Sequence, residues 1–95
     1  MKLIWISKWW LSEEQYDTLP HDFDDVIHVK QEMPIDGDLA LALINAILAK
    51  YPEDDYAVGG DFKANVAARL VRHTLRPIYL PVEDKEEKHS HWEHY

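Results

Sequence analysis

Residues 56–63 read YAVGGDFK, and this stretch decides how the rest of the chain is organised. A short apolar strand runs into Gly59 and Gly60, and a patterned helix follows over residues 62–74. The unpaired N–H groups and the positive dipole end of that helix favour an anion, so the glycine turn is a candidate ligand site. The alternative is a turn that serves the fold alone.

The flanking sequence supplies further strands and helices in alternation. We expect strands at residues 2–7, 25–30, 55–58 and 76–82, and helices at residues 12–19, 39–51 and 62–74. This alternation predicts a single Rossmann-like α/β domain of three layers, with helices on both faces of a four-stranded, mostly parallel sheet. Pro77 and Pro81 cannot donate to a central ladder, so the last strand should be an edge. The strand order 2-1-3-4 satisfies this condition.

Capping residues mark where the helices begin. Ser12 and Gln15 form a predicted capping box, and Asp36 or Asp38 is expected to cap the second helix. Asp61 is expected to be the N-cap of the third helix. The helical spacing predicts that the second helix buries Leu39, Leu43, Ile44, Ile47, Leu48 and Tyr51.

In this strand order, the loops after the first and third strands meet at the topological switch point, where open α/β sheets bind ligands. Lys8 and Lys63 would bind phosphate oxygens there as point charges, and the alternative for both is a solvated surface lysine. The predicted ligand-binding residues are Ser7, Lys8, Trp9, Trp10, Gly59, Gly60, Asp61, Phe62, Lys63 and Asn65.

Two further groups of side chains have open alternatives. Trp9 and Trp10 are adjacent and cannot both point into one core, so an exposed ring can stack on a base or seal a dimer interface. Asn65, Arg69 and Arg72 share one face of the third helix, which is either solvated or turned toward a partner subunit.

Composition restricts the class of protein. The 95 residues suffice for one domain, and the absence of cysteine excludes disulfides and thiolate chemistry. A formal net charge of −8 argues against binding to duplex nucleic acid, although residues 56–82 carry four basic residues and one acid and can hold a small anion. The chain has no apolar run long enough for a membrane and no signal-peptide pattern, so we expect a cytoplasmic protein.

Residues 83–95 are expected to form a charged tail outside a domain that covers residues 1–82. His89, His91 and His94 have a spacing that could bind zinc. Because cysteine and a structural frame are both missing, the sequence predicts no metal site and no cofactor.

Four segments carry a resemblance to a known family. The first strand ends in Ser7, a helix opens with Leu11 to Gln15, Gly60 to Asn65 follows the third strand, and Arg76 to Tyr79 opens the last strand. This pattern resembles the small stand-alone ring nucleases of type III CRISPR systems, which are relatives of the CARF domain. The resemblance covers residues 2–82, and its more specific parts are Gly60-Asp61-Phe62 and Pro77-Ile78-Tyr79.

The resemblance implies a Rossmann-like homodimer that binds a cyclic oligoadenylate, cyclic tetra-adenylate above all, across its twofold axis and degrades it to switch off antiviral signalling. A metal-independent cleavage would use the ligand's own 2′-hydroxyl to form a 2′,3′-cyclic phosphate. Lys63 and the backbone of residues 60–62 would stabilise the phosphorane, and Ser7 and Lys8 would orient the sugar.

Two alternatives to cleavage remain. The family commonly has a histidine after the serine where this chain has Lys8, so one alternative is a protein that sequesters the messenger without cutting it. The other is a protein-interaction module without a nucleotide ligand, in which the tryptophans and the alanine-rich third helix form the interface.

Overall fold

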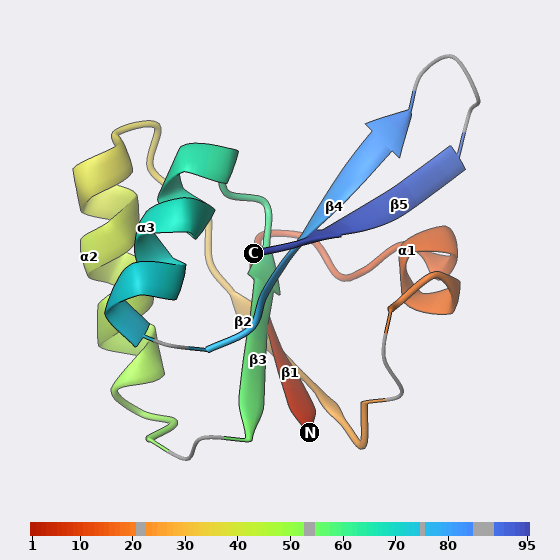
Figure 1. Cartoon of the computed structure of the whole chain (residues 1–95), viewed down its shortest axis with the longest axis horizontal. Coiled ribbons are helices and arrows are strands. Elements are labelled where there is room, and N and C mark those ends of the chain that lie inside the picture. The colour runs from red at the N-terminus through yellow and green to blue at the C-terminus, as the bar shows by residue number, and fades with distance from the viewer. Residues whose placement is uncertain (21–22, 53–54, 75, 85–88) are drawn as a thin grey trace.

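The computed structural model describes residues 1–20, 23–52, 55–74, 76–84 and 89–95, and it has a mixed α/β architecture (Figure 1). Strands and helices alternate until the end of the chain, where two strands follow one another. The elements are β1 (Lys2–Ser7), α1 (Glu13–Asp17), β2 (Val26–Lys30), α2 (Gly37–Leu48), β3 (Tyr56–Gly60), α3 (Ala64–Thr74), β4 (Ile78–Asp84) and β5 (His89–His94).

The sheet has the order β2-β1-β3-β4-β5. Its first four strands pair in parallel, which confirms the predicted order 2-1-3-4 within a larger sheet. The prediction of four strands is wrong, because residues 89–94 add β5 in antiparallel pairing with β4. These residues belong to the segment that we expected to be a tail, and the part of that segment at residues 85–88 lies outside the described residues.

Pro81 does not make β4 an edge strand, contrary to the expectation. The backbone N–H of Ile78 donates to the carbonyl of Tyr95 at 3.3 Å, so the backbone N–H and C=O groups of even-numbered residues in β4 point toward β5. The carbonyl of Pro77 accepts the N–H of Val58, so the backbone groups of odd-numbered residues point toward β3. The backbone nitrogen of Pro81 therefore points toward β3. The register of β3 with β4 covers Val58 and Gly59 only, so the proline lies beyond it and costs no ladder hydrogen bond.

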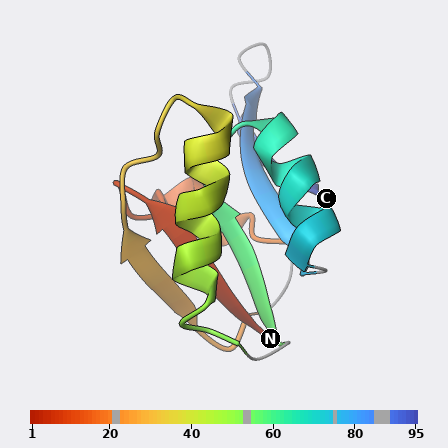
Figure 2. The same ribbon diagram turned by 90° about the vertical axis from the view of Figure 1, so that its left-hand side faces the viewer.

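Helices cover both faces of the sheet, as predicted. Figure 2 shows α2 and α3 side by side in front of the sheet, and Figure 1 shows α1 on the other side, below β5. The larger core lies under α2 and α3 and includes Ile4, Ile6, Ile44, Val58, Leu70 and Ile78, all fully buried. On the α1 side, Leu3, Ala57 and Tyr79 form a smaller core, against which Phe23 and Trp92 pack.

The prediction that α2 buries Leu39 is wrong. Leu39 is 62% exposed, whereas Ala40 and Leu41 are buried together with Ile44 and Ile47. Successive residues of a helix are rotated by about 100°. Leu39 therefore falls just outside the buried stripe that begins at Ala40.

Gly59 and Gly60 end β3 and do not form a turn, which corrects the prediction. Neither glycine needs a left-handed backbone, and both serve close packing. A Cβ on Gly60 would lie 2.3 Å from the carbonyl oxygen of Ile6 and 2.7 Å from the ring of Phe62, and a Cβ on Gly59 would lie 3.1 Å from the Tyr79 carbonyl. The glycines thus let β1, β3 and the Phe62 ring approach one another.

Candidate functional site

The ends of β1 and β3 meet where the sequence predicts. Ile6 pairs with Gly60 in the parallel register, so the next residues, Ser7 at the end of β1 and Asp61 just after β3, lie side by side. The Ser7 hydroxyl donates a hydrogen bond to Oδ2 of Asp61. This bond joins the two loops that were expected to converge.

Ser7 is buried and its polar groups are engaged. Its side chain is 1% exposed, and Oγ also accepts the backbone N–H of Trp9 at 3.1 Å. Its carbonyl oxygen lies 2.9 Å from Nε2 of His28 and accepts the N–H of Gln31 at 3.2 Å. Ser7 therefore holds the Asp61 side chain in place. Its hydroxyl is already engaged in hydrogen bonds, whereas the sequence led us to expect it to orient a sugar.

Asp61 does not cap α3. The helix begins at Ala64, and the N–H groups of Val66 and Ala67 donate to the carbonyl of Lys63 at 3.0 and 3.1 Å. Asp61 stands three residues before the helix, too far for its side chain to act as the N-cap. Its carboxylate is exposed and turned toward Ser7 instead.

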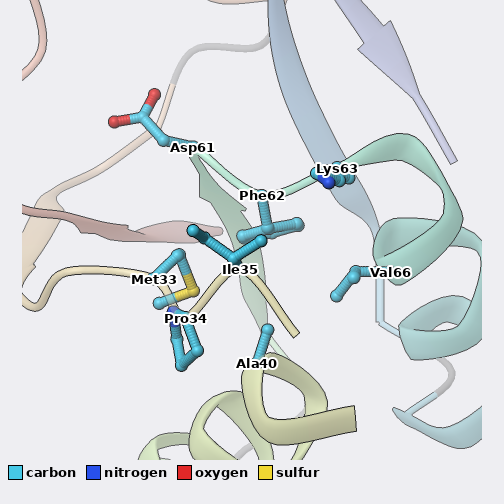
Figure 3. A pocket seen from close by; sticks show the side chains of 8 residues that line it. All are labelled: Met33, Pro34, Ile35, Ala40, Asp61, Phe62, Lys63 and Val66. Carbon is cyan, nitrogen blue, oxygen red and sulfur yellow. The ribbon is translucent and has the colours of Figure 1, made fainter. Parts of the chain in front are cut away.

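Two adjoining cavities open at this end of the sheet. One, of about 220 Å³, is lined by residues that include Ser7, Lys8, Trp9, Glu32, Met33 and Asp61. The other, of about 170 Å³, is lined by Met33, Pro34, Ile35, Ala40, Asp61, Phe62, Lys63 and Val66 (Figure 3). Met33 and Asp61 belong to both linings, so these two residues lie where the cavities adjoin, and Figure 3 shows the Asp61 carboxylate directed away from Phe62 and Val66.

The cavities are lined by both positive and negative side chains, although the sequence led us to expect a positively charged site. Lys8 lines the first cavity and Lys63 the second. Asp61 adds a carboxylate to both, and Glu32 adds one to the first. The lysines can bind an anion, and the carboxylates can accept hydrogen bonds from hydroxyl or amino groups.

The two tryptophans after β1 are exposed and have different surroundings. The side chain of Trp9 is 69% exposed, and Nζ of Lys8 lies 5.4 Å from the centre of its ring. The backbone of Trp9 is held in place because its carbonyl accepts the indole N–H of Trp5 at 2.8 Å. Trp10 is 51% exposed and makes an edge contact with His28, with ring centres 5.1 Å apart. Trp9 thus lines the first cavity and carries an exposed ring on a backbone that is held by hydrogen bonds.

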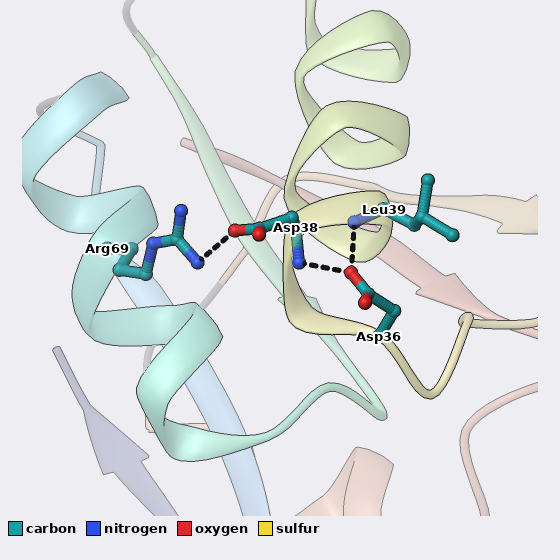
Figure 4. Close-up of polar contacts among 4 residues, drawn as sticks. All are labelled: Asp36, Asp38, Leu39 and Arg69. Atoms are coloured by element: carbon teal, nitrogen blue, oxygen red, sulfur yellow. Dashed lines mark hydrogen bonds and ion pairs between the residues drawn. The ribbon is translucent and has the colours of Figure 1, made fainter.

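Some predicted ligand-binding residues lie away from the cavities. Gly59 and Gly60 are buried in β3 and line neither of them. Asn65 is exposed on α3, outside both linings. On the same helix, Arg69 binds Asp38 of α2 at 2.8 Å, and Figure 4 shows this ion pair beside the Asp36 cap. Arg69 therefore ties two helices of one chain together.

The connection between β2 and α2 was missed as part of the site. Glu32 and Met33 line the first cavity, and Met33 and Ile35 line the second. A signal for this was present, because a parallel strand placed next to β1 must end at the same edge of the sheet. The predicted strand order therefore already placed residues 31–35 beside Ser7.

Within the described ranges, no group of three or more histidine, aspartate or glutamate side chains is arranged to hold a metal ion. His91 and His94 lie three residues apart in β5, which directs them to opposite faces of the strand, and His94 stacks on Tyr79 with ring centres 4.7 Å apart. Of the helices in the described part of the chain, none has the length and apolar character that a membrane span requires.

Comparisons of the chain with models of protein families, with curated proteins and with solved structures found no match.

Proposed function

We propose that the chain is a Rossmann-like domain that binds a cyclic oligoadenylate, probed first as cyclic tetra-adenylate, at the cavities beside Ser7 and Asp61. The observation that carries the proposal is the junction of the β1 and β3 loops, where two cavities adjoin between Lys8 and Lys63. The lysines supply counter-charges for phosphates, and the exposed Trp9 ring supplies a stacking surface for a base. A ligand with both phosphates and bases fits this combination.

The size of the cavities supports a ligand shared between two chains. Ligand pockets commonly enclose about 300–1,000 Å³. The cavities measure about 220 and 170 Å³, so each is smaller than such a pocket. A ring of several nucleotides needs a larger enclosure, which a second copy related by a twofold axis would supply. We therefore propose a homodimer that closes around a ring of matching symmetry.

We further propose that the bound ring is cut without a metal, in the manner of a ring nuclease of type III CRISPR defence in the cytoplasm. The 2′-oxygen of one ribose attacks the adjacent phosphorus, and the product is a 2′,3′-cyclic phosphate. Lys63 and Lys8 stabilise the charge that builds on the phosphoryl oxygens. Because Ser7 is buried and engaged, it acts through Asp61 and not on the sugar directly.

Sequestration without cleavage is the second candidate function. It is favoured by the position after Ser7, where an exposed lysine paired with an aromatic ring stands in place of a histidine that could transfer protons. Both candidates require the same ring to bind, and they differ in whether a linear product forms.

The test is incubation with radiolabelled cyclic tri-, tetra- and hexa-adenylate, followed by gel shift and by chromatography of the products. A shifted ring together with a linear product ending in a 2′,3′-cyclic phosphate supports the nuclease. A shifted ring that stays intact with excess protein selects sequestration. If none of the three rings shifts, the proposal is wrong, and a protein-interaction module is the remaining interpretation.

A further inference from the structure

The Asp61 carboxylate is the acceptor best placed at the site. Asp61 lines both cavities, and the residue is exposed although its neighbour Ser7 is buried. Oδ2 receives the Ser7 hydroxyl, while Oδ1 makes no hydrogen bond to the described residues. Ser7 thus holds one oxygen of the carboxylate, and the other oxygen is not engaged by any residue that the structure describes.

The backbone around Ser7 fixes the direction of this carboxylate. The space beside Gly60 is too small for a Cβ, because the Ile6 carbonyl lies there. The glycine therefore lets the ends of β1 and β3 lie close together. Ser7 is then held by the N–H of Trp9, by the N–H of Gln31 and by His28. A base whose orientation is set by a third group in this way is a recurrent feature of active sites.

The other polar groups at the cavities are less suited to accept a proton. The ammonium groups of Lys8 and Lys63 are donors without acceptor capacity. Nε2 of His28 lies against the Ser7 carbonyl. Glu32 is an acceptor but lines only the first cavity. In addition, the negative charge of a carboxylate repels a phosphate and weakens its binding. An aspartate at this position is therefore expected to contribute to the reaction in another way.

We infer that Asp61 is the general base of the cleavage and that Ser7 is its positioning residue. This inference rests on the proposed function. The 2′-hydroxyl gives its proton to Oδ1 of Asp61 as the 2′-oxygen bonds to phosphorus. The bond from phosphorus to the 5′-oxygen breaks, and the leaving oxygen keeps the electron pair and takes a proton from water. Asp61 returns its proton to water, so the reaction consumes no co-reactant.

The test compares Asp61→Asn with Glu32→Gln, because both changes remove one charge from a cavity wall and keep the shape of the side chain. For each folded variant, the dissociation constant of the ring and the single-turnover rate for bound ring are measured. Asp61→Asn should slow the bound reaction by about 100-fold or more, while binding is retained or tightened. Glu32→Gln should slow it far less. Equal losses in the two variants would mean that charge alone matters, and the inference would be overturned.

The role of Ser7 has its own readout. Ser7→Ala should slow cleavage in the wild-type background and should have no further effect in the Asp61→Asn background. Ser7→Thr keeps a hydroxyl and should restore the rate. A loss from Ser7→Ala that is equal in both backgrounds would contradict a role that acts through Asp61.

The outcomes separate this inference from the function on which it rests. Absence of ring binding by the wild-type chain overturns both. Binding without cleavage overturns the base and leaves the binding function in place. If circular dichroism shows that Asp61→Asn does not fold, Asp61→Glu, which moves the carboxylate by one methylene, takes its place, and an unchanged rate in that variant would overturn the inference.

Discussion

Gly60 is the residue on which the geometry of the site depends most directly. A Cβ at this position would overlap the Ile6 carbonyl oxygen and the Phe62 ring, so the absence of a side chain lets the ends of β1 and β3 lie close together. The neighbouring backbone belongs to the sheet and cannot easily move away. Ser7 is the last residue of β1 and Asp61 directly follows β3, so a change of packing at Gly60 is expected to disturb the hydrogen bond between them.

We expect Gly60→Ala to destabilise the fold by about 1–3 kcal/mol or more, because the new methyl group would overlap backbone atoms of β1. Gly37→Ala is the matched control, since a Cβ there meets Val66 at an ordinary 3.7 Å. That control should be neutral or slightly stabilising. Urea unfolding of both variants measures the difference, and equal stabilities would contradict the account of the glycine.

Tyr95 supplies a prediction about pH. Its hydroxyl donates to Oε2 of Glu93 at 2.8 Å, and this bond, a small loss of solvation and the charge of Glu93 together raise the pKa of Tyr95. The folded state therefore favours the neutral phenol. The resulting stability is present below the ordinary tyrosine pKa of about 10 and is lost as the pH rises through the raised value.

An NMR titration of the Tyr95 ring should show this raised pKa in the wild-type chain. Glu93→Gln removes the carboxylate, so the pKa should return toward the ordinary value. An identical titration curve in the two proteins would show that Glu93 has no influence on Tyr95.

At the scale of the elements, β5 is the strand that links α1 to the rest of the sheet. Trp92 of β5 makes an edge contact with Trp5 of β1, with ring centres 5.9 Å apart, and its indole N–H donates to the carbonyl of Gln15 in α1 at 3.2 Å. The short helix α1 has no buried residue of its own. Its attachment to the sheet therefore relies on this strand.

Trp92→Ala should cost up to about 3 kcal/mol of stability, since the ring is only partly buried, and it should loosen α1. Trp92→Phe keeps a ring but loses the N–H donor and should cost about 1 kcal/mol. Chemical denaturation gives the stabilities, and hydrogen exchange of the α1 amides reports the loosening. Unchanged exchange in Trp92→Ala would show that α1 is held by other contacts.

The sequence predicted β1, β2, β3 and α2 because their apolar residues are dense and bounded by turns or prolines. It could not predict β5, since residues 89–94 read HSHWEH and contain one apolar residue, Trp92. That strand forms because the backbone edge of β4 offers hydrogen bonds, which a pattern of side chains does not reveal. The meeting of Ser7 and Asp61 followed from the strand order, but the bond between them depends on where α3 begins, and Lys63 takes the position that Asp61 was expected to hold.

At the scale of the whole molecule, two features bear on self-association. Ile35 is 89% exposed and lines the second cavity, and Leu39, in the first turn of α2, is 62% exposed. The chain also carries a net charge of −8, which opposes contact between copies except where charge is balanced. The edge of the cavities, where lysines and carboxylates mix, is such a place.

Light scattering coupled to chromatography should therefore give twice the mass of one chain in the presence of cyclic tetra-adenylate. Ile35→Glu should shift the chain toward the monomer without unfolding it, because the side chain is almost fully exposed. Tyr16→Glu is the control, since Tyr16 is 53% exposed on α1, on the other side of the sheet. A monomer in all three proteins would contradict the proposed homodimer.

The hydrogen bond between Ser7 and Asp61 links two positions that are 54 residues apart in the chain. If Ser7 were replaced by an apolar residue, the carboxylate would lose its anchor, and if Asp61 were replaced, a buried hydroxyl would lose its acceptor. Selection would then act on the two positions as one unit. In descendants of this gene we expect a hydroxyl at position 7 to be inherited together with an aspartate at position 61, and to be lost together with it.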